Sequence, residues 1–375
     1  MLTGAALASD SGARTPDAGD VNLLLPPVVY AVAGREMSVY FANLFPVDLP
    51  ADWTVRVEAG IGRQFQDRWT LKAEAKETGE HPFALSVHDR RGREMARAAT
   101  VVRVAPAPAG NGRRIRILLV GASIVDGGSF PLELRRLLVE AGFDPVFIGS
   151  HTGGGRADDP DGVRREGYGG WRWETFLSRW ETPETDYRSR SKFLREENGR
   201  AVPDLEGFFA RYGGGEPPDV VIFLLGVNDI ASAKPATRDR DIAASLASME
   251  KLLALFRSAA PKALLGVSLL PPPAPSQDAF GLNYGLSINR SDYRAAQHGW
   301  VAAVIAAHAG LSDMSVIPVF SGLDCVNGYP RKEAPVFEGS TVTARRYTNA
   351  VHPDENGHRQ IAQTFYAWLI NHMEP

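Results

Sequence analysis

Short apolar runs alternate with amphipathic segments along the chain from residue 113 onward. The first run, 115–120, has no polar residue after Arg116, which is typical of a strand buried on both faces of a parallel sheet. Apolar residues at helical spacing follow in 131–141, and Gly142 predicts the end of that helix.

The same alternation continues to the end of the chain. Strand and helix in series imply right-handed βαβ units and a parallel sheet covered by helices on both faces. The predicted fold class is therefore α/β, with a parallel-sheet α/β/α sandwich. The predicted strands are 115–120, 145–148, 220–225, 263–270 and 315–320, and the predicted helices are 131–141, 242–256, 292–309 and 353–371.

Residues 21–105 have a different pattern. Short β-rich runs such as VVYAV, WTVRVEAG and ATVVRVA are separated by Gly, Pro, Asp and Asn. Their spacing predicts a small β-sandwich domain ahead of the α/β domain. Residues 106–112 are rich in Pro, Ala and Gly and predict a semi-stiff linker, so that the α/β domain spans 113–375.

Composition excludes several classes of function. The net charge is -3 and no Lys/Arg cluster occurs, which argues against a nucleic-acid partner. No apolar stretch is long enough to span a membrane. Cys325 is the single cysteine and no Cys or His group has zinc spacing, so we expect no disulfide, metal or cofactor. The sequence does not determine the oligomeric state.

The first twenty residues predict either a disordered tail or the remnant of an export signal. Ala6-Leu7-Ala8 resembles a cleavage site, but a basic segment is lacking and the apolar part is short. We expect a periplasmic or secreted protein, with a cytoplasmic location as the alternative.

Three stretches bring candidate chemistry to the ends of predicted strands. Ser123 follows the first strand, and it is either a nucleophile or a small turn residue. Asn228, in GVND after strand 220–225, offers an amide donor for an oxyanion or simply bonds its own backbone. His352 precedes Pro353 at the start of the last helix, where it is either a base or a solvated loop residue.

A glycine-rich stretch, EGYGGWRWE at 166–174, adds backbone donors. Glycine allows N–H groups to approach a ligand closely, as an oxyanion hole requires. Trp171 and Trp173 flank it, either packed into the core or presenting a flat ring to a sugar or an acyl chain. The long polar stretch 150–215 around it is too long for a bare loop, so we expect a helix or a functional insertion there.

The ordered set of G-x-S, a glycine-rich block, G-x-N-D and a terminal H-P resembles the SGNH hydrolases, the four-block branch of the GDSL esterases. The resemblance covers 113–372 and implies a flavodoxin-like fold. It implies Ser123 as nucleophile, His352 as base, and Gly170 and Asn228 as oxyanion donors, with the Ser123 N–H as a third. Gly169 is the alternative glycine if the block is shifted by one.

Two positions depart from the family pattern. Ala122 stands where the family has Asp, and we expect little effect because that Asp is not the nucleophile's partner. Asn349 stands where the family has Asp three residues before the His. In a serine protease, this exchange lowers turnover by about 10⁴. We expect Asn349 or a backbone carbonyl to orient His352, unless Asp354 or Asp324 supplies a charge.

These residues predict a serine esterase that acts by two-step acyl transfer. The resemblance extends to bacterial carbohydrate acetyl esterases with an N-terminal β-domain, which favours an O-acetyl carbohydrate as substrate. The alternatives are a generic short-chain or lipid esterase and a non-catalytic carbohydrate-binding protein on an inactive hydrolase scaffold. A metal-dependent phosphoesterase would need a cluster of Asp and His ligands that the sequence lacks.

Overall fold

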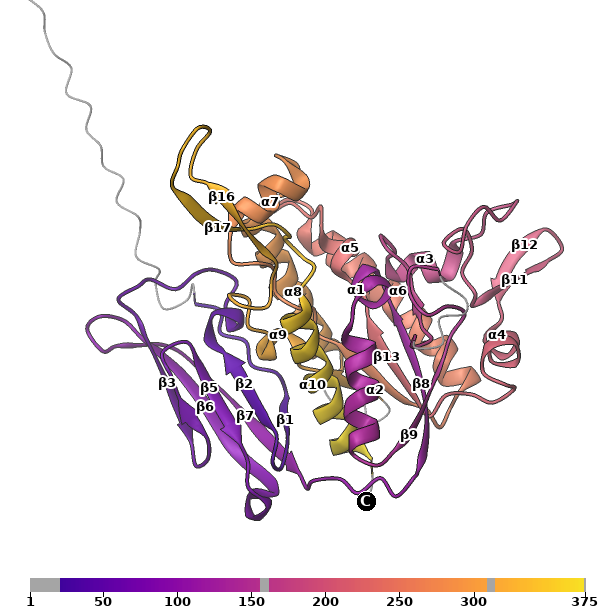
Figure 1. Cartoon of the computed structure of the whole chain (residues 1–375), viewed down its shortest axis with the longest axis horizontal. Coiled ribbons are helices and arrows are strands. Elements are labelled where there is room, and N and C mark those ends of the chain that lie inside the picture. The colour runs from indigo at the N-terminus through magenta and orange to yellow at the C-terminus, as the bar shows by residue number, and fades with distance from the viewer. Residues whose placement is uncertain (1–20, 156–161, 309–313, 374–375) are drawn as a thin grey trace, which may run out of the picture.

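A computed structural model describes residues 21–155, 162–308 and 314–373. The predicted tail or signal at 1–20 lies outside the described residues. Two modules are visible in Figure 1: a β module of residues 21–105 and an α/β module of residues 114–373, joined by a short connector.

The α/β module is built on a parallel sheet with the strand order β9–β8–β13–β14–β15. Each pairing along this order is parallel, and β10 continues the edge of β8 where β9 ends. This is the flavodoxin-like order 2-1-3-4-5, so the predicted fold is confirmed. The strands are β8 (Arg114–Gly121), β9 (Asp144–Ile148), β10 (Glu166–Gly167), β13 (Val220–Leu224), β14 (Leu264–Ser268) and β15 (Met314–Ile317).

Helices cover both faces of this sheet (Figure 1). Helices α2 and α10 pack together on one side, and α6 packs with α3 and α8 on the other. The helices are α1 (Ser123–Gly127), α2 (Phe130–Glu140), α3 (Trp173–Ser178), α4 (Leu205–Tyr212), α5 (Val227–Ile230), α6 (Arg238–Ala259), α7 (Gln277–Tyr284), α8 (Arg290–His308), α9 (Val319–Gly322) and α10 (Glu355–His372). None of the helices in the described part of the chain is both long and apolar enough to cross a membrane.

The last predicted strand is too long. β15 ends at Ile317, and Val319 and Phe320 belong to the short helix α9. Pro318 stands between them, and proline has no N–H to donate to a strand ladder, which explains the early end.

Two small hairpins occupy the irregular stretches of the α/β module. β11 (Leu194–Glu197) pairs with β12 (Arg200–Pro203), and β16 (Arg331–Pro335) pairs with β17 (Thr343–Tyr347). The second hairpin leads directly into the segment that carries Asn349.

The β module contains a sheet with the order β1–β7–β6–β3 and a smaller sheet with the order β2–β5–β4. Its pairings are antiparallel except that β1 runs parallel to β7. Trp69 and Phe83 meet edge to face in its core at 4.9 Å between ring centroids. The elements are β1 (Val28–Val32), β2 (Glu36–Tyr40), η1 (Phe41–Leu44), β3 (Thr54–Ala59), β4 (Arg63–Gln64), β5 (Arg68–Lys72), η2 (Ala75–Glu77), β6 (Gly79–His88) and β7 (Glu94–Ala105).

The two modules share one buried hydrophobic core, so they are joined by packing as well as by the connector. Arg294 of α8 is buried and donates to Phe45 O at 3.2 Å and Val47 O at 3.0 Å. Hydrogen bonding from Arg290 and the charge of Arg294 hold the pKa of Asp48 well below its usual range. These contacts fix the β module against the α/β module.

Candidate active site

Ser123 is the first residue of α1, two residues after the end of β8. The turn is tight: a Cβ on Gly121 would lie 2.0 Å from Val125 Cγ2 and 2.8 Å from Leu224 O. Only glycine fits there, so the chain can turn directly from strand into helix. At this position the N–H of Ser123 has no acceptor within the helix and remains available to a ligand.

His352 reaches Ser123 from a segment more than two hundred residues away. The Oγ of Ser123 lies 2.7 Å from Nε2 of His352, which is a hydrogen-bond distance. Burial lowers the pKa of His352 below its usual value, so the ring is neutral at pH 7 and Nε2 can accept the hydroxyl proton.

Asn349 holds the other ring nitrogen of His352. Its Oδ1 lies 3.1 Å from Nδ1, and it also accepts from the backbone N–H groups of His352 at 2.9 Å and Val351 at 3.2 Å. Two backbone donors identify this atom as the oxygen, so Nδ1 must carry the proton and Nε2 the lone pair. The side-chain amide therefore orients the imidazole in the tautomer that a general base needs.

The two aspartates considered as charged partners are engaged elsewhere. Asp354 caps α10 by accepting from the N–H groups of Asn356 at 2.9 Å and Gly357 at 3.2 Å. Asp324 accepts from the N–H groups of Val326 and Asn327. Within the described residues, burial accounts for the shifted pKa of His352 without a carboxylate. The constellation is thus Ser–His–Asn, an arrangement comparable to the Cys–His–Asn set of papain-like proteases.

Asn228 lies on α5, directly after β13. Gly226 begins this turn with a φ of 119°, where a Cβ would press on Trp300. The Nδ2 of Asn228 donates one hydrogen to Trp171 O at 2.8 Å. A primary amide has two such hydrogens, so the second remains for an oxyanion. This contact brings Asn228 against the glycine-rich block.

The glycine-rich block follows β10 along the same sheet edge. Gly170 is exposed and has a φ of 83°, so glycine is needed there for its backbone conformation. The N–H of Gly169 already donates to Asp126 Oδ2 at 3.3 Å. The geometry therefore favours Gly170 over Gly169 as the backbone donor.

Trp171 and Trp173 do not line an open cleft, which corrects the prediction that they bind substrate. Their exposed fractions are 4% and 0%. Trp171 stacks on Tyr168 at 4.1 Å between centroids, and Trp173 packs against Phe223 of β13. Large aromatic rings gain most by full burial, and here both sit in the core.

Asp126 is the residue that the sequence pattern did not bring to notice. It lies one turn after Ser123 on α1 and is buried, with an exposed fraction of 9%. Its carboxylate accepts from Gly154 N at 2.7 Å, Gly169 N at 3.3 Å and Tyr187 OH at 2.8 Å. One carboxylate thus ties the nucleophile helix to the oxyanion block. The only signal in the sequence is a charge inside the run SIVDG.

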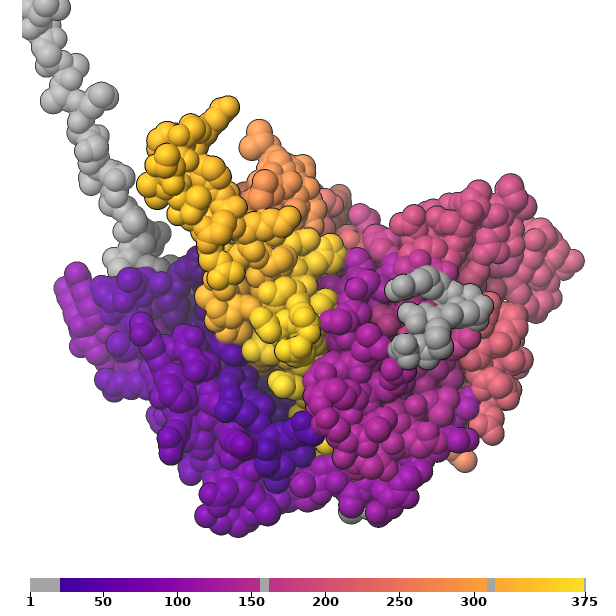
Figure 2. All heavy atoms as spheres, in the orientation of Figure 1, coloured from indigo at the N-terminus to yellow at the C-terminus, as the bar shows by residue number. Residues whose placement is uncertain are grey.

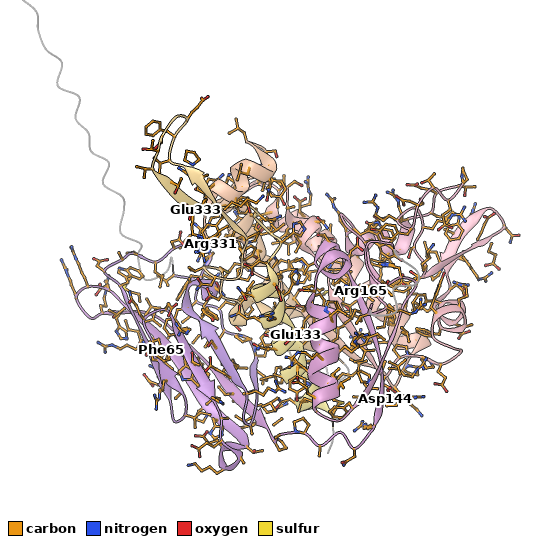
Figure 3. All side chains as sticks on the ribbon, viewed as in Figure 1. Phe65, Glu133, Asp144, Arg165, Arg331 and Glu333 are labelled. Atoms are coloured by element: carbon orange, nitrogen blue, oxygen red, sulfur yellow. The ribbon has the colours of Figure 1, made fainter. Side chains whose placement is uncertain are left out.

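Buried polar groups continue behind this carboxylate. Glu166 of β10 is fully buried, accepts from Tyr168 OH and Ser150 N, and has its pKa raised by burial to about 7. Arg165, labelled in Figure 3, donates to Val125 O at 2.8 Å beneath α1. This layer fixes the backbone on which the candidate residues stand.

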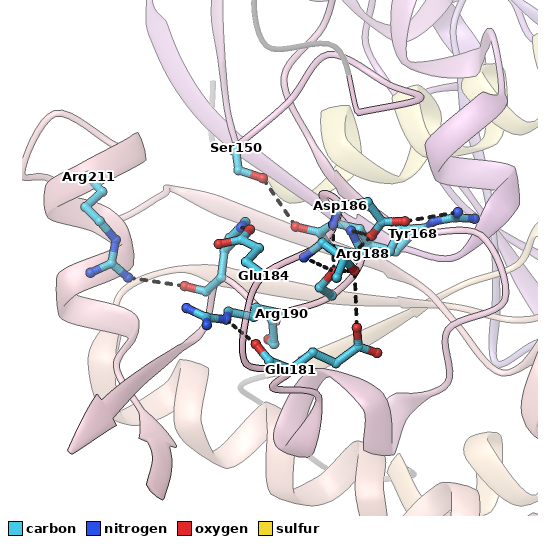
Figure 4. A network of polar contacts seen from close by, with 12 residues as sticks. Ser150, Tyr168, Glu181, Glu184, Asp186, Arg188, Arg190 and Arg211 are labelled. Atoms are coloured by element: carbon cyan, nitrogen blue, oxygen red, sulfur yellow. Dashed lines mark hydrogen bonds and ion pairs between the residues drawn. The ribbon is translucent and has the colours of Figure 1, made fainter. Parts of the chain in front are cut away.

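The predicted insertion in 150–215 supplies Tyr187 to Asp126. Figure 4 shows how this segment holds its own shape: Arg190 Nε donates to Glu181 O at 2.6 Å, and Arg211 Nη2 donates to Lys192 O at 3.3 Å. Near the same network, Ser150 Oγ lies 3.2 Å from Tyr168 OH. The described part of the insertion, residues 150–155 and 162–215, therefore supports the site through Tyr187.

Residues 160–360 match the GDSL-like Lipase/Acylhydrolase family. This range contains Gly170, Asn228, Asn349 and His352 and begins after Ser123. No curated protein sequence matches the chain.

Several solved structures resemble the chain at low identity. A family 3 carbohydrate esterase from Clostridium thermocellum is 20% identical, with 68% of this chain and 94% of that chain covered and a TM-score of 0.40. A family 3 carbohydrate esterase from Talaromyces cellulolyticus is 19% identical, with 68% and 96% covered and a TM-score of 0.38. A carbohydrate acetylesterase family member from Sinorhizobium meliloti is 15% identical, with 68% and 97% covered and a TM-score of 0.39.

Proposed function

Because the chain belongs to the GDSL-like lipase/acylhydrolase family, we propose that it hydrolyses O-acyl esters with Ser123 as nucleophile and His352 as general base. One observation carries this proposal: Ser123 Oγ lies 2.7 Å from the nitrogen of His352 that bears the lone pair. A hydroxyl and a neutral imidazole in this contact form an activated nucleophile.

The proposed reaction has two steps. His352 takes the proton of Ser123 while Oγ attacks the ester carbonyl, and the N–H of Gly170 and the amide of Asn228 hold the oxyanion. The alcohol leaves with the proton from Nε2, and an acyl group stays on Ser123. Water, activated by the same imidazole, then attacks this acyl group and releases the acid.

We assign the substrate to O-acetyl or other short O-acyl esters of a carbohydrate. The support is a hydrophilic groove of about 510 Å³ beside the glycine-rich block. Arg172 and Asp229 line it and adjoin the oxyanion candidates in sequence. Further along, charged and hydroxyl side chains line it: Glu174, Ser232, Lys234, Thr237, Arg240, Asp241 and Ser248. Such a surface suits an alcohol that carries many hydroxyl groups.

A second candidate is an esterase of apolar or lipid esters, and a different surface favours it. Leu282, Leu286 and Phe337 have exposed fractions of 66%, 103% and 69% on α7, just after it, and on the hairpin β16–β17. This hairpin, marked by Arg331 and Glu333 in Figure 3, leads along the chain into the segment that carries His352, and Asn283 of α7 bonds to Thr348 and Ala350 of that segment. Exposed apolar groups next to a site indicate an apolar partner.

Hydrolysis of p-nitrophenyl acetate by the wild type and by Ser123→Ala tests the esterase proposal. We expect the activity to vanish in the variant. Equal and negligible rates in both proteins would instead favour a carbohydrate-binding protein. Acetate release from acetylated polysaccharides, compared with hydrolysis of fatty-acyl esters, then separates the two substrate classes. Export from the cytoplasm also remains our proposal, and mass spectrometry of the mature N-terminus tests it.

A further inference from the structure

A cavity of about 320 Å³ lies between the β module and α10. Figure 2 shows the corresponding valley between the indigo β module and the yellow C-terminal part of the chain. Glu36, Ser38 and Tyr40 alternate along β2 and line one wall. Gln360, Gln363, Thr364 and Ala367 recur at helical spacing on α10 and line the other.

The cavity is not a consequence of loose contact between the modules. Elsewhere the interface is closed by direct bonds: Asn43 Nδ2 donates to Leu323 O at 2.7 Å, and His298 Nε2 lies 3.3 Å from Leu44 O. Near the C-terminal end of α10, Asn371 Nδ2 donates to Ala31 O of β1 at 2.9 Å. The hollow thus sits inside an interface that is held on both sides of it.

The walls carry hydroxyl and amide groups that retain hydrogen-bonding capacity. Gln360 Nε2 donates to Tyr40 OH at 3.2 Å, which leaves a second amide hydrogen and the phenolic proton. Ser38 Oγ and Thr70 Oγ1 lie 2.8 Å apart, so one of the two hydroxyl protons is used between them. Thr364 Oγ1 donates to Gln360 O at 3.0 Å and keeps its lone pairs.

The charged groups of the cavity are balanced. Arg35 pairs with Glu140 at 3.3 Å, and its guanidinium lies over the ring of Tyr366. Glu36 stands directly opposite Lys72 in the β2–β5 ladder. The lining therefore attracts neither an anion nor a cation, and it offers uncharged donors and acceptors beside aromatic rings.

We propose that this interdomain cavity binds a neutral polyhydroxylated ligand of the size of one or two sugar rings. Pockets of this volume commonly lie at domain interfaces and orient their ligand with a few polar groups. The site is separate from Ser123, and the proposal does not depend on the esterase activity.

Isothermal titration of the full chain with xylose, xylobiose, glucose, cellobiose and glucuronate tests the proposal. Ser123→Ala serves as the common background. We expect at least one neutral sugar to bind and glucuronate to bind more weakly than glucose. Tyr40→Phe and Gln363→Ala, each of which removes one polar group, should weaken binding about 5-fold. Tyr212→Phe, which removes the same atom far from the cavity, should leave it unchanged.

Three results would overturn the proposal. They are no binding of any neutral sugar at millimolar concentration, a preference for glucuronate, or loss of binding in Asn228→Ala but not in Tyr40→Phe. The last result would place the sugar at the candidate active site. Tyr40→Phe in a chain that keeps Ser123 should hydrolyse p-nitrophenyl acetate at the wild-type rate, so failure of the esterase proposal and failure of this one are measured separately.

Discussion

Replacing Asn349 with aspartate would put a negative charge on the atom that accepts the Nδ1–H of His352 at 3.1 Å. The side chains have the same shape, and the carboxylate can still accept from the backbone N–H groups of Val351 and His352. The exchange therefore changes charge and leaves the orientation of the imidazole intact.

The expected magnitude follows from Coulomb's law. With about 5 Å between charge centres and an effective dielectric constant of about 20, the carboxylate stabilises the imidazolium by roughly 3 kcal/mol. This equals about two pKa units. Burial now lowers the pKa of His352, so the added charge opposes that shift and raises the pKa. His358, on which the charge of His352 also acts, has its pKa lowered to about 4 mainly by burial and stays neutral above pH 5.

The assay is the pH profile of kcat/KM for p-nitrophenyl acetate between pH 5 and 9. We expect the acid limb of Asn349→Asp to move upward by one to two pH units, that is by about the pKa change above. At pH 8.5 the rate should rise about 10- to 100-fold, because the imidazolium formed in the transition state gains the same stabilisation. Asn349→Ala is the control and should lose rate without such a shift. An acid limb that does not move in Asn349→Asp would refute Asn349 as the partner of the base.

Three further predictions concern the surroundings of the site. Asp126→Asn should lower kcat about 10-fold with little change in KM, because an amide cannot accept from all three of its donors. Asp186→Asn changes an exposed carboxylate of the insertion and should leave kcat unchanged. Equal effects of the two variants on kcat would contradict the positioning role of Asp126. Asn228→Ala should lower kcat by about 10²–10³, and an unchanged kcat measured at saturating ester would exclude it from the oxyanion hole. Burial raises the pKa of Glu166 to about 7, which is higher than in the unfolded chain. The stability that its protonated form contributes is therefore complete at low pH and is lost as the pH rises through 7. As the pH rises from 5 to 8, the Tm of Glu166→Gln should therefore fall less than the Tm of the wild type. Parallel Tm curves would show that Glu166 does not titrate in this range.

The positions of Ser123 and Asn228 were predictable because each follows an apolar run of a parallel sheet. Carboxyl ends of neighbouring parallel strands meet at one edge, and β8 and β13 are such neighbours. His352 was predictable from its place before the last helix. For these residues, local sequence and the topology of the fold agree.

Other features depend on contacts that the local pattern does not contain. The burial of Trp171 results from stacking on Tyr168 and an edge-to-face contact with Phe176, which the sequence alone does not determine. Asp126 acquires its role from Tyr187, which lies 61 residues away along the chain. Arg294 is the counterpart of Asp48 across the module interface, and no spacing rule links them.

The C-terminal third of α10 has no side that faces water, whereas Glu355, Asn356, Arg359 and Gln363 nearer its start are exposed. Residues 365–370 are buried in succession, between the central sheet on one side and β1 on the other. Such a helix is stable only while both of its neighbours are present. A shortened chain that began at Arg113 would leave this helix half uncovered, and His352 stands just before it. The β module is thus part of the folded body that supports the segment of His352, and its removal should destabilise that segment.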